Sequence, residues 1–402
     1  MKIGLLIDSM IGGGAERVSL NLAEGFLRQG HEPHLILLRD QIQHALPADL
    51  PVHALSGSEA PSRHRLLNKL QMAWRLRTLV KRLEADGEPF AFFISSAEEM
   101  DHLSALAGLH DVYIRYRNSM VEFYRNKLAS RTGIKRLFRR LKWGLILRLF
   151  YDRRRLITVA KALQQEIVGQ MGLQPASIAT IYNPFDFESI RAQGAAYPVP
   201  LTEPYVVYAA RFTPRKRQDL LLRAFARSHT RHTHKLVLLG DTYSQHERGW
   251  YEQLLALIEE LGLQDRVVLP GFQTNPYPWI RHAALFAMSS DSEGLPTVLI
   301  EALILGTPVV STDCPTGPRE IMTGELARFL CPRDNPADLA DRIDAALTSY
   351  PEISDALLRR FHCDYAISRY LQHCSKGPLP PAKQGRVRGI PGGTLIPPYH
   401  PR

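Results

Sequence analysis

A strand, a short polar loop and an apolar helix follow one another over residues 285–303, and this stretch constrains the fold more than any other. Residues 285–288 are apolar throughout, as the buried strands of parallel sheets are. The loop that follows contains Glu293 and Gly294, and Pro296 stands where a helix can begin without losing a hydrogen bond. A strand that leads directly into a helix in this way predicts an α/β domain with a ligand at the strand end.

The same loop has the chemistry that a phosphorylated ligand needs. Gly294 lets the backbone come close to a ligand, and the free N–H groups at the positive end of the helix suit a phosphate. Because a helix rises about 1.5 Å per residue, Glu301 stands a turn or two behind this point, where its carboxylate suits the hydroxyls of a ribose. Glu293 lies on the opposite side of the phosphate position from Glu301. If the ligand is a diphosphate, Glu293 is near the group attached to its far end. A surface loop with two solvated glutamates is the alternative.

Alternating strand and helix patterns occur twice along the chain and predict two doubly wound α/β domains. A buried strand opens each half, at residues 2–8 and 205–210. The predicted organisation is a first domain over residues 1–185, a linker over 186–204, a second domain over 205–360, a helix over 361–375 that can cross back to the first domain, and a disordered Pro- and Gly-rich tail over 376–402.

Three consecutive glycines, Gly12 to Gly14, follow the first predicted strand. They do not fit the G-x-G-x-x-G fingerprint of dinucleotide-binding domains, and Asp40 is only close to the position where the acidic residue of that fingerprint stands. An NAD site is therefore not favoured. The glycines fit a loop that brings bare backbone close to a ligand, and they fit a tight turn equally well.

Two cations, Arg211 and Lys216, stand five residues apart after the strand predicted at 205–210. In a doubly wound sheet this is the strand end at which ligands bind. An arginine can hold a diphosphate through two parallel hydrogen bonds, while a lysine acts as a point charge. A solvated basic turn is the alternative, but a second polar strand end at Gly294 favours an anionic ligand shared by the two loops.

The chain of 402 residues carries a formal net charge of +10, which suggests an anionic partner. Ten Lys or Arg residues and a single acid lie within residues 131–155, where apolar residues recur at helical spacing. A helix of this kind can lie in the interface of an anionic membrane. We expect the membrane contacts to come from Arg136, Phe138, Arg139, Arg140 and Trp143.

Two other interpretations of this basic segment stay open. A core-facing helix with a solvated basic back has the same pattern, and nucleic acid would also match the charge. No interleaved aromatic motif or nucleic-acid-binding fold accompanies the basic residues, so nucleic acid is not an expected partner. No apolar run approaches the roughly 20 residues of a membrane span, and the N-terminus does not have the pattern of a signal peptide. We therefore expect a cytoplasmic protein bound peripherally to the inner face of the cell membrane.

These glycines and charged residues together resemble family 4 of the retaining glycosyltransferases. The residues that carry the resemblance are Gly12–Arg17, Arg211, Lys216, Glu293, Glu301 and Gly306–Val310, and residues 313–320 resemble the branch that builds bacterial surface polysaccharides and glycolipids. The resemblance covers residues 1–372. It implies the GT-B fold, in which two Rossmann-like domains face each other across a cleft.

The resemblance also implies a role for each of these residues. Arg211 and Lys216 would hold the donor diphosphate and stabilise the leaving nucleoside diphosphate, and Glu293 would contact the donor sugar. Such cationic clamping agrees with the chemistry, because the transition state separates an oxocarbenium-like sugar from a dianionic leaving group. The other donor contacts that the resemblance implies are Gly13, Gly14, Phe272, Gly294, Leu295, Pro296, Thr297 and Glu301, with Glu301 on the ribose.

One position departs from the family pattern. Many members have a histidine after the strand that ends here at Tyr116, whereas this chain has Arg117 followed by Asn118. These two residues can orient donor or acceptor oxygens, but an arginine cannot act as a base. The chain lacks an Asp-x-Asp pair for a donor metal, and its four cysteines lack metal-site spacing. We predict transfer without metal or cofactor, with the nucleotide sugar as co-substrate.

The resemblance implies a hexosyl- or N-acetylhexosaminyltransferase. It would move a sugar from a nucleotide sugar, with UDP favoured by the family, to a lipid-linked or glycolipid acceptor in bacterial surface polysaccharide or lipopolysaccharide synthesis. A sugar phosphorylase or an epimerase of the same fold is one alternative. A non-catalytic protein that binds nucleic acid through residues 131–155 is another, and convergence of the cations and glutamates at one site would exclude it.

Overall fold

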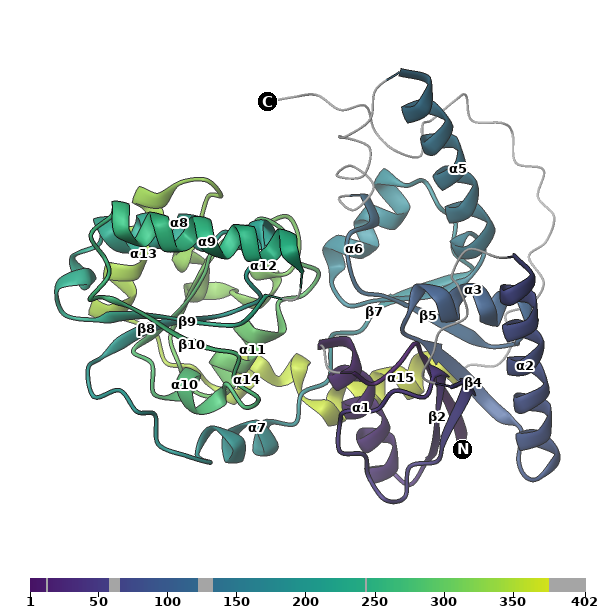
Figure 1. Cartoon of the computed structure of the whole chain (residues 1–402). Helices are drawn as coiled ribbons and strands as arrows, with labels where there is room; N and C mark the ends of the chain where they lie inside the picture. The colour runs from purple at the N-terminus through teal and green to yellow at the C-terminus, as the bar shows by residue number, and fades with distance from the viewer. Residues whose placement is uncertain (12–13, 58–65, 122–132, 243, 376–402) are drawn as a thin grey trace. The chain divides into compact units, whose positions relative to one another are not determined.

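The computed structural model describes residues 1–11, 14–57, 66–121, 133–242 and 244–375. Over these residues the chain forms two compact units. The first unit comprises Met1–Pro184 together with the chain from Cys363 onward, and the second comprises Phe185–His362. Each unit has a parallel β-sheet between layers of helices (Figure 1), which confirms the predicted pair of doubly wound α/β folds.

In the described residues, the sheet of the first unit has seven strands in the order β3-β2-β1-β4-β5-β6-β7. All neighbouring strands pair in parallel. The spatial order runs outward from the centre in both directions, so it reverses between β1 and β4. The strands are β1 (Lys2–Ile7), β2 (Glu32–Arg39), β3 (Val52–Ser56), β4 (Phe90–Ser95), β5 (Val112–Tyr116), β6 (Arg155–Thr158) and β7 (Ser177–Thr180).

The sheet of the second unit follows the same plan with six strands, again counted over the described residues, in the order β10-β9-β8-β11-β12-β13. Its pairings are parallel, and the order reverses between β8 and β11. The strands are β8 (Tyr205–Ala209), β9 (Lys235–Leu239), β10 (Val267–Gly271), β11 (Leu285–Met288), β12 (Val309–Thr312) and β13 (Leu330–Cys331).

Helices cover both faces of each sheet. Those described in the first unit are α1 (Gly14–Arg28), α2 (Leu66–Ala85), α3 (Glu98–Leu106), α5 (Gly133–Tyr151), α6 (Lys161–Gln165) and α15 (Cys363–Cys374). Those described in the second unit are α7 (Phe187–Gly194), α8 (Gln218–Arg227), α9 (Gln245–Glu260), α10 (Tyr277–Arg281), α11 (Thr297–Ile304), α12 (Pro318–Ile321), α13 (Pro336–Thr348) and α14 (Asp355–Leu358).

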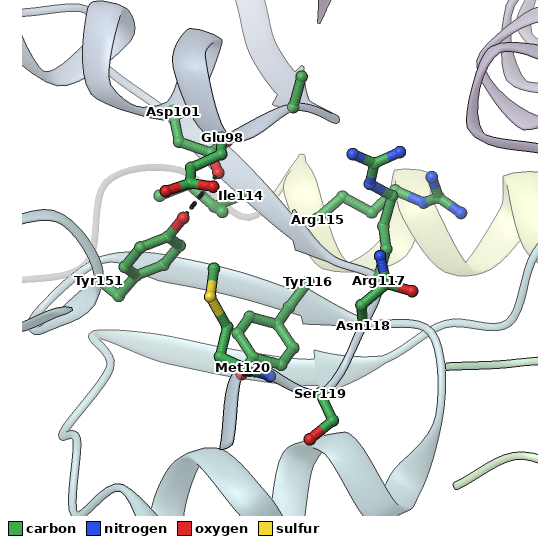
Figure 2. A pocket seen from close by; sticks show the side chains of 11 residues that line it. Glu98, Asp101, Ile114, Arg115, Tyr116, Arg117, Asn118, Ser119, Met120 and Tyr151 are labelled. Carbon is green, nitrogen blue, oxygen red and sulfur yellow. Dashed lines mark hydrogen bonds between the residues drawn. The ribbon is translucent and has the colours of Figure 1, made fainter. Parts of the chain in front are cut away.

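The reversal of strand order marks where a ligand can bind. In doubly wound sheets, ligands bind outside the carboxyl ends of the strands at this point. In the first unit, β4 and its neighbour β5 end at the pocket drawn in Figure 2. In the second unit, the corresponding loops follow β8 and β11, and they carry the charged residues that the sequence singles out.

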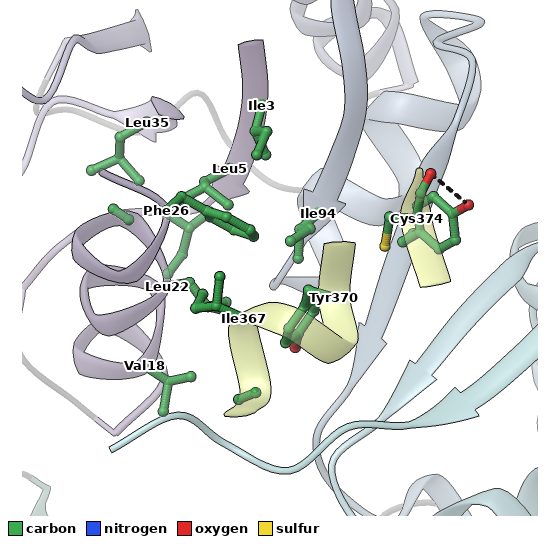
Figure 3. Close-up of a cluster of buried hydrophobic side chains, with 14 of the residues drawn as sticks. Ile3, Leu5, Val18, Leu22, Phe26, Leu35, Ile94, Ile367, Tyr370 and Cys374 are labelled. Atoms are coloured by element: carbon green, nitrogen blue, oxygen red, sulfur yellow. Dashed lines mark hydrogen bonds between the residues drawn. The ribbon is translucent and has the colours of Figure 1, made fainter. Parts of the chain in front are cut away.

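The core of the first unit lies on both sides of its central strand. Successive side chains of a strand point to opposite faces. Alternate residues from Ile3 to Ile7 therefore pack against α1 and α15, whereas Leu6 packs with α2 and α3. Figure 3 shows the first of these clusters, in which the rings of Phe26 and Tyr370 have their centroids 6.4 Å apart. The last described helix, α15, thus completes the core of the first unit.

The predicted linker over residues 186–204 was wrong in its first half, because the chain forms α7 there as part of the second unit. Asp186 caps this helix by accepting a hydrogen bond from the N–H of Ser189 at 2.9 Å. Phe187 and Ile190 are buried, and the helix packs against α10 and α11. Apolar residues three apart are enough to bury one face of a short helix. The predicted tail over residues 376–402 lies outside the described residues.

Candidate functional site

The loop after β8 carries the two predicted cations on a tight turn. Pro214–Lys216 forms one turn of 3₁₀-helix, and Arg217 follows it with a φ of 49°. A residue with a side chain rarely adopts this left-handed backbone, so surrounding contacts must hold it.

The guanidinium group of Arg217 makes those contacts. Its Nε donates to Asp219 at 3.0 Å, and its Nη1 donates to Asp291 at 3.0 Å and to Asp334. The three carboxylates come from α8, from the loop after β11 and from the loop before α13. The turn that bears Lys216 is therefore fixed to three separate elements of the second unit.

Backbone contacts join the same turn to the loop after β11. The hydroxyl of the buried Ser289 donates to the carbonyl of Arg217 at 2.7 Å, and it lies 3.0 Å from that of Lys216. The N–H of Asp291 donates to the carbonyl of Arg215 at 2.9 Å. The two loops at the reversal of strand order thus form one structure, as the sequence predicts for a shared ligand.

Within that structure, the half-buried Lys216 forms an ion pair with the buried Glu293. The Nζ of Lys216 donates to Oε1 of Glu293 at 2.5 Å, although the two residues are 77 positions apart. Burial acts to raise the pKa of Glu293, but the ammonium of Lys216, together with Ser290 and Arg215, more than offsets it and holds this pKa below its usual range. Glu293 is therefore a carboxylate at neutral pH. Two further N–H groups of Lys216 stay available to a ligand oxygen.

Arg211 pairs with a carboxylate that the sequence analysis did not identify. Its Nη2 lies 2.9 Å from Oε1 of Glu247, in the first turn of α9, and the Arg211 side chain is 54% exposed. Arg211 and Lys216 thus lie on one loop but are held by different glutamates. A partly exposed guanidinium can exchange a carboxylate partner for a phosphate.

The start of α11 is packed tightly from one side. The N-cap residue of this helix is Pro296, and residues 293–296 are buried. The hydroxyl of Thr316 donates to the carbonyl of Glu293. Gly317 has a φ of 95°, and a Cβ at this glycine would lie 2.4 Å from Cδ of Pro296 and 3.1 Å from the carbonyl oxygen of Gly294. The loop after β12 therefore fixes the loop that carries Glu293.

The remaining predicted donor contacts lie around this loop. Glu301 is half-buried on α11, and its Oε1 accepts a hydrogen bond from the hydroxyl of Tyr277 at 3.2 Å. Thr297 is half-buried, and the side chain of Leu295 is buried, so only the backbone of Leu295 can face a ligand. Phe272 directly follows β10 and is 59% exposed.

The first unit has a pocket of its own, with a volume of about 150 Å³, where β4 and β5 end. The predicted residues Arg117 and Asn118 line it. Asp101 of α3 lies against it, and its carboxylate accepts hydrogen bonds from Ser95 at 2.5 Å and from the hydroxyl of Tyr151 at 3.2 Å. Burial raises the pKa of Asp101 to about 7. The glycine loop adds only Gly14, the first residue of α1, because Gly12 and Gly13 lie outside the described residues.

Comparison with known proteins assigns the chain to a family. The family described as Glycosyltransferase Family 4 matches residues 12–189, and the one described as Glycosyl transferases group 1 matches residues 189–359. The N-acetylgalactosamine-N,N'-diacetylbacillosaminyl-diphospho-undecaprenol 4-alpha-N-acetylgalactosaminyltransferase of Campylobacter jejuni is 31% identical over 338 residues, which are 83% of this chain and 87% of that protein. The chain belongs to glycosyltransferase family 4.

Other relatives agree with this assignment. The lipopolysaccharide 1,6-galactosyltransferase of Escherichia coli K12 is 28% identical over 194 residues, which are 46% of the chain and 49% of that enzyme. The crystal structure of Anabaena HepE in complex with UDP and glucose superposes with a TM-score of 0.67 at 19% identity, and it covers 93% of this chain and 99% of its own. The protein is a glycosyltransferase with the GT-B fold of two Rossmann-like units.

The basic helix of this glycosyltransferase exposes an apolar stripe. Phe138, Leu141, Leu145 and Leu149 of α5 are 62% to 70% exposed, and Leu147 on the opposite face is buried. The exposed cations Lys142 and Arg148 border the stripe. A purely core-facing helix is therefore excluded for the described residues. No helix in the described part of the chain has the length and apolar character that a membrane crossing needs.

The residues predicted to contact the membrane differ in exposure in this structure. Phe138 and Arg139 are exposed, and their contact with a membrane stays a prediction. Trp143 is half-buried, because α5 turns it toward the face that packs on the unit, and the leucines form the exposed stripe instead. The side chains of Arg136 and Arg140 lie outside the described residues.

Sequence analysis also missed several residues of the two sites. The sequence analysis did not single out Arg217, Asp101 or Tyr151. Gly317 was noted only for its family resemblance. The one available signal was the Gly317-Pro318 pair, since this dipeptide often marks a special turn. The described residues contain no group of three or more metal-ligating side chains, and metal-independent transfer stays a prediction.

Proposed function

We propose that this glycosyltransferase retains the configuration of the transferred sugar, uses a UDP-sugar donor and acts on a lipid-linked or glycolipid acceptor in bacterial surface polysaccharide or lipopolysaccharide synthesis. The observation that carries the proposal is the ion pair of Lys216 with Glu293 beside the start of α11. The Campylobacter relative, named for a diphospho-undecaprenol acceptor, and HepE, whose structure contains UDP, support the acceptor and the donor.

Lys216 would act on the leaving group. As the sugar–phosphate bond breaks, negative charge builds up on the diphosphate, and a fixed cation stabilises that charge without reorganisation. Glu293 holds the ammonium of Lys216 in place, and Arg211 can add a second cation once its guanidinium moves from Glu247 to a phosphate oxygen. Because the chain itself supplies these charges, we propose that transfer needs neither metal nor cofactor.

Glu301 would bind the ribose of the donor. Its carboxylate is oriented by the hydroxyl of Tyr277, and carboxylate oxygens are acceptors that suit the hydroxyls of a ribose. Phe272 offers an exposed ring at the same edge of the sheet for the base. We assign the acceptor to the pocket of the first unit, where Asn118 and Asp101 can bind sugar hydroxyls.

A donor panel tests the proposal. The full chain is incubated with UDP-, GDP- and ADP-linked sugars and a bacterial lipid extract, with and without EDTA. We expect label to move from a UDP-sugar into the lipid fraction, with EDTA having little effect and the α-configuration of the donor kept in the product. No transfer from any donor, together with no thermal protection by UDP or GDP, would refute it. Phosphate-dependent release of a sugar phosphate would instead indicate a phosphorylase.

We further propose that the enzyme docks peripherally on the inner face of the cell membrane through α5. Each leucine that enters the membrane interface contributes roughly 1.5–3 kcal/mol to membrane binding. Replacing the exposed Leu141 and Leu145 with glutamate should therefore abolish flotation with anionic liposomes. Leu255→Glu, at an exposed leucine of α9, is the matched control and should float like the parent. Equal flotation of the double variant would show that α5 does not contact lipid.

A further inference from the structure

The pocket of the first unit contains a buried guanidinium with an unused donor. Arg115, on β5, is 3% exposed. Its Nε donates to the hydroxyl of Tyr370 at 3.1 Å and its Nη2 donates to Oδ1 of Asn183. Its Nη1 is also buried, but it has no hydrogen-bond partner among the described residues. An unsatisfied buried donor on a charged group costs more than one on a neutral group, so a ligand that accepts from it gains stability.

A second guanidinium lies next to the first. Arg117 stands two positions further along the chain and lines the same pocket, and Figure 2 shows the two guanidinium groups together. Burial and then the charge of Arg115 lower the pKa of Arg117. Within the described residues, no ion pair involves either arginine. Two neighbouring positive charges destabilise each other, and an anion that binds between them relieves this repulsion.

The acidic residues nearby do not supply that anion. Asp8, Glu16 and Asp101 act on Arg117 through space. The carboxylate of Asp101 is already held by Ser95 and Tyr151, and Figure 2 shows it with Glu98 on the other side of the pocket from the guanidinium groups.

We propose that Arg115 and Arg117 form an oxyanion subsite that binds a phosphate group carried by the acceptor. Two guanidinium groups match the several oxygens of a phosphate better than the two of a carboxylate. A cavity of about 150 Å³ far exceeds the ~10–15 Å³ that one water needs, so there is space for the group. The acceptor as carrier rests on the proposed function, whereas anion binding itself does not.

Calorimetry with inorganic phosphate tests the subsite directly. Every protein in this experiment carries Lys216→Ala. This change removes the main cation that would bind the nucleotide sugar in the second unit. We expect phosphate still to bind, and adding Arg117→Gln to weaken it at least about tenfold, with partial recovery in Arg117→Lys. Arg77→Gln removes the same charge from an exposed site on α2 of the first unit and should leave the phosphate affinity nearly unchanged. Loss of phosphate binding in folded Lys216→Ala protein, or an equal phosphate affinity after Arg117→Gln is added, would overturn the subsite.

Kinetics then identify the carrier of the phosphate. Arg117→Gln, with Lys216 intact, should raise the KM for the lipid acceptor and leave the KM for the nucleotide sugar unchanged. A rise in the donor KM alone would assign the anion to the donor diphosphate and contradict an acceptor phosphate. If the enzyme transfers no sugar at all, the proposed function fails, but the calorimetric result still decides whether the subsite exists.

Discussion

Replacing Lys216 with alanine is expected to lower kcat/KM for the nucleotide sugar by about 100- to 1,000-fold, the range seen when one fixed charge-stabilising donor is removed from an active site. The reason lies in the geometry of the site. Lys216 is held by Glu293 at 2.5 Å and by a turn that Arg217 fixes to three carboxylates, so its charge is placed before the donor binds. Steady-state transfer with a saturating acceptor measures the loss.

A double variant separates this effect from a loss of stability. Lys216→Ala leaves the buried carboxylate of Glu293 without its partner, and breaking such a pair costs about 3–5 kcal/mol. Adding Glu293→Gln removes the orphaned charge, so the double variant should recover most of the unfolding midpoint but not the turnover. Near-normal turnover in either variant would show that Lys216 is not the cation that acts on the leaving group.

The pH dependence of stability follows from the same pair. Because the pKa of Glu293 is lowered in the folded protein, its ion pair stabilises the fold above the ordinary carboxyl pKa of 4.5 and loses this contribution as the pH falls below it. The parent should therefore lose stability relative to the double variant as the pH falls below about 4.5, whichever protein is the more stable at neutral pH.

Both sheets were predictable from the sequence because parallel strands are buried on both faces and read as short apolar runs. The run at residues 285–288 coincides with β11. Helix α7 was missed because its eight residues bury only one narrow face, and the Pro-rich stretch after it looks like a linker. The Pro-rich composition of this stretch predicted a linker more strongly than the short apolar pattern predicted a helix. The helices against which α7 packs, α10 and α11, lie far along the chain.

The candidate site was predictable in its residue types but not in its pairings. Arg211, Lys216, Glu293 and Glu301 could be named because they stand at strand ends or at the start of a helix. Their partners could not, since Lys216 meets Glu293 across 77 positions and Arg217 meets Asp334 across 117. Such contacts depend on how the loops after β8, β11 and β12 fold against one another.

The orientation of α5 also could not be predicted from the sequence. Its helical period was readable, but two faces of this helix are apolar. Leu147 and Tyr151 became the buried face because they pack inside the first unit, and Tyr151 also reaches Asp101. Trp143 then falls at the border. Periodicity gives the spacing of a stripe, and only the neighbouring elements decide which stripe faces solvent.

Gly317→Ala is expected to destabilise the second unit by about 2–6 kcal/mol and to weaken UDP binding with it. Two costs add at this position. A φ of 95° strains any residue with a side chain, by roughly 1–3 kcal/mol. The new Cβ would also lie 2.4 Å from Cδ of Pro296, and overpacking of this kind costs roughly 1–3 kcal/mol more. Since Pro296 is the N-cap of α11, any relief of the clash moves the start of that helix.

Gly306→Ala separates the two costs. Gly306 also has a positive φ, of 81°, but a Cβ there would meet no atom within 4 Å. It should lower the urea midpoint only by the backbone strain and leave the affinity for UDP unchanged, whereas Gly317→Ala should change both. Urea unfolding and calorimetry with UDP measure the two effects. If the two variants behave alike, the contact of the loop after β12 with Pro296 does not hold the nucleotide site, and the start of α11 is set by its own sequence.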